Sequence, residues 1–251
     1  MTNESFFYVI YSLIQGITEF IPISSSGHLN LLEITKGEAE ERNFLYETTA
    51  HLASLLALIF YLYKNQHFSK NNIKNSFFPI ALATIPALIV GLFLIILEVN
   101  IVSLKIIGIA SIFGGLMLYF SDMKKFQKIR IESKVLKFFF AGLFQCLAFI
   151  PGFSRSGSCI IAFRLLGESR SSSSIFSLYL GIPIISLSFL SNIRNFENIF
   201  LDINLIIIFF VTFLAAYLTL FLFINFINKI GFTPFVIYRI CLGIIILGYF
   251  Y

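Results

Sequence analysis

Six apolar runs, each long enough to cross a lipid bilayer as a helix, limit the fold of this chain more than any other feature. They cover roughly residues 44–63, 77–97, 102–120, 174–192, 204–228 and 231–251. A helix rises about 1.5 Å per residue, so a hydrocarbon core about 30 Å thick needs about 20 residues. Of the 251 residues, 58% are hydrophobic and only 12% are charged, which is about half the charge of a soluble domain. We therefore expect an all-α, polytopic membrane protein with six transmembrane helices.

Two further segments, roughly 6–33 and 135–167, begin as apolar helices but break at polar clusters. The first breaks at "PISSSGH" and the second at "PGFSRSGS". Broken backbone at membrane depth is tolerated only where protein buries it or where it lines a wet cavity. The pattern therefore predicts two re-entrant helix pairs whose breaks lie inside the membrane. Function should be located at these breaks.

The two broken segments resemble each other, which indicates an internal duplication. A shift of 130 residues places Gln15 on Gln145, Ser24 on Ser154, Ser26 on Ser156 and Gly27 on Gly157. We divide the single membrane domain into repeats 1–125 and 126–251, each with one re-entrant pair followed by three crossings. Because three is odd, the second repeat is inverted relative to the first. Such inverted repeats bring their broken elements face to face near the midplane.

Lysine and arginine are concentrated in loops 64–76 and 121–137, which the crossings place on one side. The positive-inside rule predicts that this side is cytoplasmic, with both termini and the mouth of the first re-entrant pair outside. Membrane topology therefore explains the net charge of +5 without a nucleic-acid partner. The first apolar segment lacks a basic n-region and a small-residue cleavage site, so we interpret it as mature protein. The three cysteines are scattered and predict neither a disulfide framework nor redox chemistry.

Ionisable residues at the breaks are the strongest functional signal, because charges at membrane depth are costly and usually functional. Gln15 and Glu19 are four residues apart and share one helix face. The second break places Arg155 at the start of a helix, where free amide groups and the helix dipole favour anions. An arginine fork can grip a phosphate with two hydrogen bonds. Two such helix ends facing each other predict a cage for phosphate or diphosphate, lined by Ser24, Ser26, Gly27, Ser154, Ser156 and Gly157.

Cleavage of a phosphoanhydride needs a nucleophile, neutralisation of the charge that spreads over the transferred phosphoryl group, and relief of the leaving phosphate. Ser25 or His28 could attack, and the sequence leaves both open. Glu19 could act as a base or hold a divalent cation together with Gln15. Arg155 could stabilise the transition state. We interpret His51 as a supporting or packing residue. Arg164 and Arg239 are interpreted as interfacial anchors or structural residues.

"QGITEFIPISSSGHL" (15–29) and "QCLAFIPGFSRSG" (145–157), together with "FTPFVIYRI" near the end of the chain, resemble the signature regions of the undecaprenyl-diphosphate phosphatases of the bacitracin-resistance type. The resemblance covers essentially the full chain. It implies removal of the terminal phosphate of undecaprenyl diphosphate, which regenerates the carrier lipid for peptidoglycan synthesis, in the inner membrane of a bacterium. It further implies roles for Glu19, Ser25, His28 and Arg155 and the use of Mg²⁺ or Ca²⁺. The site is expected near the membrane midplane, open to the outer side.

The chain departs from the pattern of this family at three positions. Gln15 stands where many relatives have a second carboxylate, Cys159 where threonine is common, and His51 where glutamine is frequent. The alternative function is a transporter or lipid flippase, because inverted repeats with facing broken helices are also transporter architecture. Release of inorganic phosphate from a polyprenyl diphosphate distinguishes the two. The expected partners are the bilayer and the polyprenyl diphosphate, with a second copy of the chain, in a homodimer, as a further candidate.

Overall fold

The protein is helical throughout the part that the structure describes. The computed structural model describes residues 3–36, 44–65, 70–99, 101–127, 129–192 and 203–250. In these ranges there is no β-strand, and six helices are long and apolar enough to cross a membrane. They are α3 (Phe44–Lys64), α4 (Lys70–Ile96), α5 (Leu104–Asp122), α8 (Arg170–Asn192), α9 (Ile203–Ile230) and α10 (Thr233–Phe250). The predicted all-α fold with six candidate transmembrane helices is confirmed.

The helices start and end within a few residues of the apolar runs, except that α4 begins at Lys70. Its first turns are polar and precede the predicted apolar run. Pro79 and Pro86 lie inside α4, and Pro183 lies inside α8. Prolines are tolerated in such helices because neighbouring elements can satisfy the backbone groups that they free.

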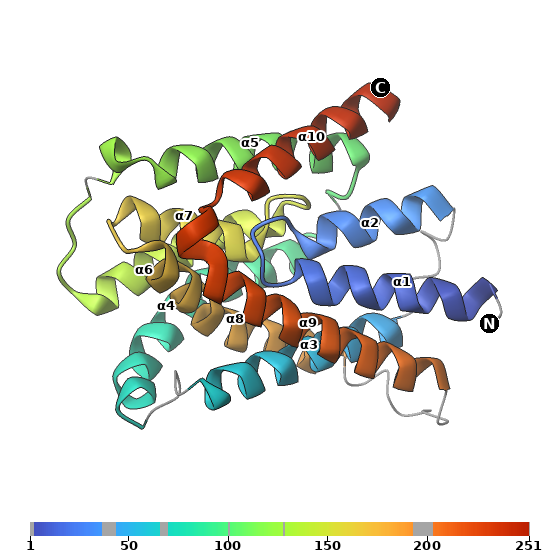
Figure 1. The fold of residues 1–251 in the computed structure, drawn as a ribbon, viewed down its shortest axis with the longest axis horizontal. Coiled ribbons are helices and arrows are strands. Elements are labelled where there is room, and N and C mark those ends of the chain that lie inside the picture. The colour runs from blue at the N-terminus through green and yellow to red at the C-terminus, as the bar shows by residue number, and fades with distance from the viewer. Residues whose placement is uncertain are drawn as a thin grey trace.

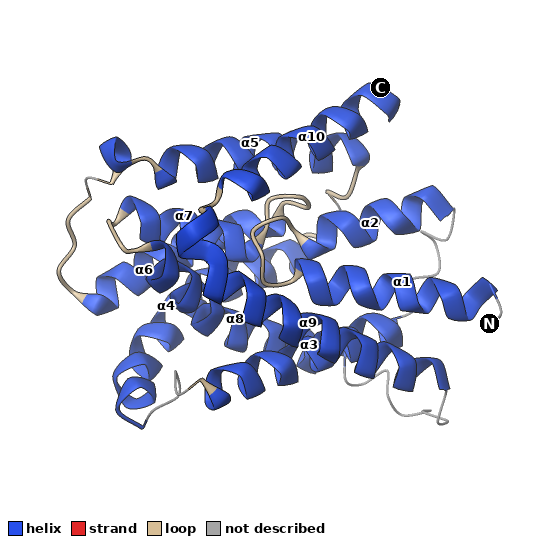
Figure 2. Ribbon diagram, viewed as in Figure 1, coloured by secondary structure: helices blue, strands red, loops and turns tan. Residues whose placement is uncertain are grey.

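The two broken segments form helix pairs, as the sequence predicts. The first pair consists of α1 (Asn3–Thr18) and α2 (Ser25–Lys36). The second consists of α6 (Lys134–Gln145) and α7 (Arg155–Leu165), with the short 3₁₀ helix η2 (Cys146–Phe149) between them. In Figure 1 the first pair lies to the right of the middle of the molecule and the second to the left. The loops that interrupt the pairs, tan in Figure 2, lie close together near the centre.

The two breaks have the same local structure at positions related by the shift of 130 residues. Ser24 has φ 78° and Ser154 has φ 77°, and both are in the left-handed region that non-glycine residues rarely occupy. The hydroxyl of Ser24 accepts a hydrogen bond from the amide of Gly27, and that of Ser154 accepts one from Gly157. Each serine thus caps the second helix of its pair. Strained backbone of this kind persists only where the surroundings impose it, and it is frequent at active sites.

Helix packing relates the two halves of the chain in the same way. α1 packs against α9, and its counterpart α6 packs against α4. α3 packs against α8 and α5 against α10, so each of these helices pairs with its own counterpart. Close approach depends on small residues: a Cβ on Gly16 would collide with Ala215 and Ala216 of α9, and one on Gly142 would collide with Ala83 of α4. Small residues serve this purpose in membrane helix interfaces.

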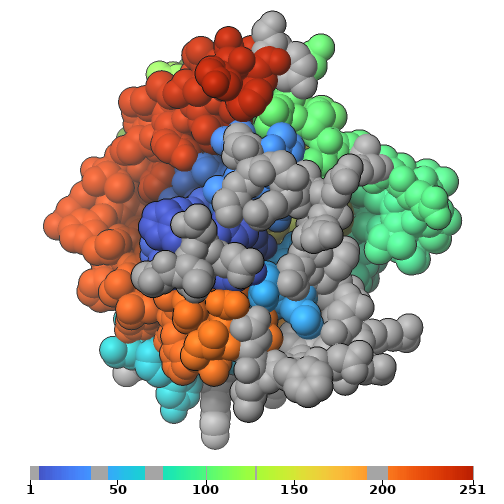
Figure 3. Space-filling model, turned by 90° about the vertical axis from the view of Figure 1, so that its right-hand side faces the viewer, coloured from blue at the N-terminus to red at the C-terminus, as the bar shows by residue number. Residues whose placement is uncertain are grey.

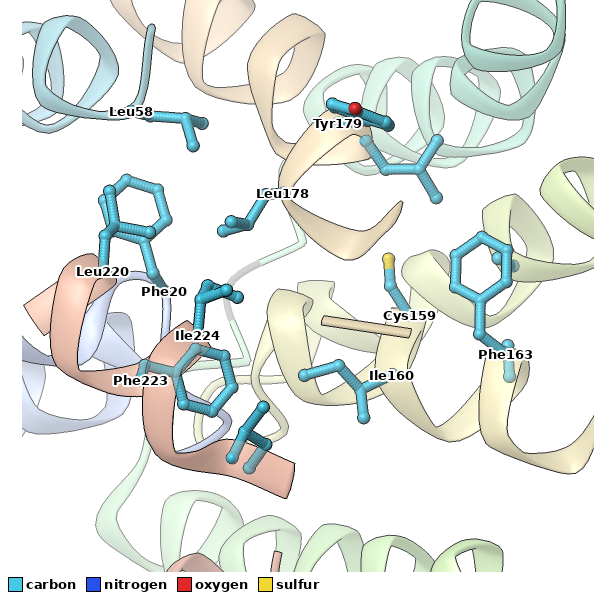
Figure 4. Packing of buried hydrophobic residues seen from close by; sticks show 14 of the residues in the cluster. Phe20, Leu58, Cys159, Ile160, Phe163, Leu178, Tyr179, Leu220, Phe223 and Ile224 are labelled. Atoms are coloured by element: carbon cyan, nitrogen blue, oxygen red, sulfur yellow. The ribbon is translucent and has the colours of Figure 1, made fainter. Parts of the chain in front are cut away.

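A single large hydrophobic core joins α3, α7, α8 and α9 around the central breaks. Figure 4 shows Phe20, beside the first break, packed with Leu220 and Ile224 of α9, while Ile160 and Phe163 of α7 contribute from the second pair. Large apolar side chains also cover the outside, especially on α4, α9 and α10. Such extensive apolar exposure is what a lipid environment requires.

Both ends of the chain lie at the same end of the molecule, as the predicted topology requires. Figure 3 looks onto this end and shows the blue N-terminal and the red C-terminal helices together. The opposite end carries ion pairs from Asp122 to Arg164 and Arg170, and from Lys137 to Glu168. Part of the loops used to predict the orientation lies outside the described residues, namely 66–69 and Lys128. The charged residues that lie on the other side in the predicted topology and are also outside the described part are Glu38, Glu40, Glu41, Arg42, Arg194, Glu197 and Asp202.

Candidate active site

An ion pair between the two breaks lies at the centre of the site. Arg155 Nη2 donates a hydrogen bond to Glu19 Oε1 at 3.0 Å, and only 10% and 8% of these two side chains are exposed. The breaks also touch directly, because Ser156 Oγ donates to the carbonyl of Ile21 at 2.9 Å. A buried pair of this kind is costly to assemble unless further hydrogen bonds complete it.

The other oxygen of Glu19 is bound from its own helix pair. Ser25 Oγ donates to Glu19 Oε2 at 2.6 Å, and Gln15 Nε2 donates to the same oxygen at 3.2 Å. Gln15 Nε2 is also 3.2 Å from His51 Nδ1, whose other ring nitrogen is 3.7 Å from Glu47 Oε1. A polar chain therefore runs from Glu47 through His51 and Gln15 to Glu19. The sequence predicts a supporting or packing role for His51, and its position at the edge of the site, in contact with Gln15, agrees with a supporting role.

α8 fixes the position of Arg155 from the side opposite Glu19. Arg155 Nη1 donates to the carbonyl of Ser177 at 3.2 Å. One turn later, Gly181 leaves room for the guanidinium, because a Cβ there would overlap Arg155 Nη1. The guanidinium is thus held between a carboxylate, a carbonyl and a glycine.

A second arginine ties both breaks to α5 and α10. Arg239 of α10 is fully buried, and its guanidinium donates to Pro22 O in the first break and to Gly152 O and Phe153 O in the second. It also donates to the carbonyls of Ala110 and Ser111 in α5. Sequence reasoning described Arg239 as an interfacial anchor or structural residue; it is structural, and it holds both loops beside the site.

His28 lies apart from the ion pair. Its Nδ1 is 2.6 Å from the carbonyl of Ser24, and its Nε2 is 2.6 Å from the hydroxyl of Tyr238 on α10, against which the ring stacks. A carbonyl only accepts, so Nδ1 carries the proton and Nε2 accepts from Tyr238. Both ring nitrogens are therefore engaged away from Glu19 and Arg155.

A cavity of about 250 Å³ lies beside the ion pair. Its polar lining includes Glu19, Ser25, Ser26, His51, Gln145 and Arg155, and its apolar lining is Ala87 of α4, Ala148 and Phe149 of η2, and Ile184 and Ile185 of α8. A smaller cavity of about 50 Å³ adjoins it through Ser25, Ser26 and His51 and is also lined by Gln15 and Glu47. One cavity thus has charged and polar side chains together with apolar ones in its lining.

The predicted phosphate-binding residues divide into two groups. Ser26 lines the cavity, whereas Ser24, Gly27, Ser154, Ser156 and Gly157 are buried and are not among its lining residues. The hydroxyls of Ser24 and Ser154 are used as helix caps, and that of Ser156 reaches across to Ile21. A Cβ added at Gly27 would lie 3.1 Å from the Cα of Gly152 in the opposite break, so the close approach of the two breaks favours glycine there. Most of this set therefore shapes the breaks.

Among the atoms near Glu19, one side-chain oxygen has the chemistry of a cation ligand. Gln15 Oε1 is buried and has no hydrogen-bond partner among the described residues. Oxygen atoms of amides and carboxylates are ligands of Mg²⁺ and Ca²⁺. No group of three or more His, Cys, Asp and Glu residues in the described part of the chain could hold a metal. The free oxygen of Gln15 would suit a divalent cation, which would take its remaining ligands from Glu19, water or substrate phosphates.

Comparison with known proteins gives a consistent result over nearly the whole chain. The family described as "Bacitracin resistance protein BacA" matches residues 8–245. The chain belongs to the BacA family. Both breaks and Arg239 fall within the matched residues. The chain is 37% identical to the undecaprenyl-diphosphatase of Pelagibacter ubique, covering 95% of this chain and 94% of that protein.

Other BacA-like relatives carry the same name. The undecaprenyl-diphosphatase of Saccharophagus degradans is 38% identical, with 94% of each chain covered. That of Campylobacter curvus is 34% identical, with 96% of this chain and 97% of the relative covered. These relatives confirm the predicted family resemblance. They give no support to the transporter alternative, because each is named as a phosphatase.

Proposed function

We propose that the protein hydrolyses undecaprenyl diphosphate to undecaprenyl phosphate and inorganic phosphate, and so recycles the carrier lipid used in bacterial cell-wall synthesis. The observation that carries this proposal is the Glu19–Arg155 pair at 3.0 Å, which joins the two breaks beside a cavity lined by both polar and apolar side chains. The charged and polar lining suits a diphosphate, and the apolar lining suits the start of an isoprenoid chain. The names of the relatives fit the same reaction.

Ser25 is the nucleophile that this geometry favours. Its hydroxyl already donates to Glu19 Oε2 at 2.6 Å, so Glu19 can accept the proton as Oγ attacks the terminal phosphorus. The anhydride bond breaks, undecaprenyl phosphate leaves with the proton that Glu19 accepted, and a phosphoserine remains beside the ionised Glu19. Glu19 then assists water in hydrolysing this intermediate, which releases inorganic phosphate and restores Ser25. His28 is the second candidate, but its two ring nitrogens are engaged with Ser24 and Tyr238.

Arg155 supplies positive charge where negative charge spreads over the transferred phosphoryl group. In the substrate-free geometry its guanidinium is bound to Glu19 and Ser177. Substrate phosphate therefore competes with Glu19 for Arg155, and binding frees the carboxylate to serve as a base. Mg²⁺ or Ca²⁺, held by Gln15 Oε1 and Glu19, would neutralise part of the diphosphate charge.

We place the cavity near the membrane midplane, open to the outer side, with the basic loops in the cytoplasm. The lipid then keeps its tail in the bilayer while only the diphosphate enters the protein. The matching conformations of Ser24 and Ser154 and the matched helix packing support two inverted repeats, 1–125 and 126–251. A homodimer stays a prediction.

Phosphate release from a C55 diphosphate by the purified protein tests the function. We expect turnover by the wild type and a loss of about 10²–10³-fold in Arg155→Ala and Glu19→Ala, because each removes charge or proton transfer from the transition state. Wild-type turnover in Arg155→Ala would contradict the site. Transport of intact lipid without phosphate release would favour the flippase.

A further inference from the structure

Gln145, a buried residue with no role in the proposed reaction, is one of the residues that line the cavity of about 250 Å³. Gln145 is the last residue of α6 and is only 2% exposed. Within the described residues, its Nε2 is buried and has no hydrogen-bond partner, and Gln145 is one of the residues that line the cavity together with Glu19 and Arg155. Leaving a buried donor unpaired costs free energy, and such groups in native structures usually await a ligand or water.

The other end of this amide is fixed. Cys159 of α7 is fully buried, and its thiol donates to Gln145 Oε1 at 3.5 Å. A glutamine amide has one accepting end and one donating end. Because the thiol occupies the oxygen, the NH₂ group is the end left without a partner.

Gln15, at the equivalent position of the first repeat, presents the opposite end of its amide. Its Nε2 is used by Glu19 and His51, and its Oε1 is the atom without a partner. An unpaired carbonyl oxygen attracts a cation, whereas an unpaired NH₂ attracts an anion. The two glutamines therefore leave different atoms without a partner: an accepting oxygen on Gln15 and a donating NH₂ group on Gln145.

We propose that Gln145 binds the diphosphate of the substrate, with its Nε2 donating a hydrogen bond to a non-bridging phosphate oxygen. This assignment rests on the proposed function. In it, the neutral amide of Gln145 and the positively charged guanidinium of Arg155 bind the same diphosphate. A neutral donor suits this position, because Arg155 is already paired with Glu19 and another cation would have to be buried without a carboxylate.

The test compares Gln145→Met with the wild type and with Gln127→Met. Gln127 is the matched control, because its Nε2 already donates to the main-chain carbonyls of Ser121 and Asp122 away from the cavity. Two quantities are measured: kcat/KM for phosphate release from a C55 diphosphate, and the affinity for methylenediphosphonate, a soluble diphosphate analogue that cannot be cleaved and has no lipid tail. The second reports head-group binding separately from the lipid tail and from chemistry.

We expect Gln145→Met to lower kcat/KM by about 10- to 100-fold, the effect of losing one hydrogen bond to a charged group. Affinity for methylenediphosphonate should fall by a similar factor, and Gln127→Met should match the wild type in both. If kcat/KM falls while affinity for the analogue is unchanged, Gln145 has a structural role and the proposal is wrong. Values within about twofold of the wild type in both measurements would also overturn it.

Two further outcomes of these measurements also bear on the role of Gln145. If Gln145→Met is not recovered from membranes, Gln145→Glu replaces it, because glutamate has the same shape as glutamine but repels the diphosphate. Wild-type affinity of Gln145→Glu for methylenediphosphonate would overturn the proposal, and a loss of affinity would support it. If the wild type releases no phosphate from the lipid, the proposed function fails. Binding of methylenediphosphonate that Gln145→Met weakens would still support Gln145 as a diphosphate ligand.

Discussion

At the scale of single residues, the geometry distinguishes Ser25 from His28, which the sequence leaves as equal candidates. Both residues stand in "SSSGH", three positions apart. Only the hydroxyl of Ser25 reaches the carboxylate of Glu19, whereas the imidazole of His28 is bound to Ser24 and Tyr238. Sequence proximity could not separate them, because the direction of each side chain depends on the exact turn between Phe20 and Ser25.

We expect Ser25→Ala to lose at least about 10³-fold in turnover, because it removes the proposed nucleophile. A phosphoenzyme trapped by rapid acid quenching of the wild type should be stable to acid, as phosphoserine is and phosphohistidine is not. The matched control is Ser186→Ala on α8, whose hydroxyl donates only to the carbonyl of Ile182. An acid-labile phosphoenzyme that persists in Ser25→Ala would assign the nucleophile to His28.

Sequence reasoning found Glu19 and Arg155 because charged residues in apolar surroundings are conspicuous. It did not foresee the position of His51, nor which end of Gln145 would be free. A histidine or glutamine inside an apolar helix is compatible with packing, with support of another residue, or with ligand binding. Only the partners of its side chain decide among these, and here they come from other helices.

At the scale of elements, Arg155 depends on α8 as much as on its own helix. Gly181 lies directly against the guanidinium, and Ser177 one turn earlier accepts a hydrogen bond from it. Two residues of α8, Ser177 and Gly181, therefore contact the guanidinium of Arg155 and limit the positions that it can take. The sequence of α8 shows only a glycine in an apolar helix, which by itself predicts close packing but not the partner.

We expect Gly181→Ala to reduce kcat/KM on the order of 100-fold, because the added methyl group overlaps the guanidinium and displaces it from the reacting phosphate. The loss should occur without loss of folded protein. Gly248→Ala is the control, since a Cβ there meets nothing within 4 Å. The measurement is phosphate release together with the recovery of monodisperse protein in detergent. Unchanged kcat/KM in Gly181→Ala would show that Arg155 is not held as described.

At the scale of the whole molecule, the side of the membrane on which each end of the protein lies can be tested directly. Both ends of the chain lie at one end of the molecule, and the segment after α5 lies at the other. We expect alkaline phosphatase fused after residue 251 to be active, because the proposed orientation places that end outside the cytoplasm. Green fluorescent protein inserted after residue 127 should fluoresce, because the same orientation places that loop in the cytoplasm. The reverse pattern would invert the orientation and move the mouth of the site to the inner side.

The sequence by itself determined the six crossings, the two interrupted helix pairs and their likeness to each other. These features depend on local composition: long apolar runs have no stable alternative to membrane helices, and serine, glycine and proline clusters interrupt a helix wherever they stand. The same local signals indicated Glu19 and Arg155 as functional, since charge in an apolar segment is conspicuous without knowledge of its neighbours.

Only the tertiary structure decided how the breaks meet. Arg239 lies some 80 residues or more from the breaks and from α5, yet it donates to carbonyls of both breaks. Those carbonyls carry no signature in the sequence, because every residue has one. The contact between Glu19 and Arg155, the engagement of His28 with Tyr238 and the free amide of Gln145 likewise depend on helices that are distant in the chain and adjacent only after packing.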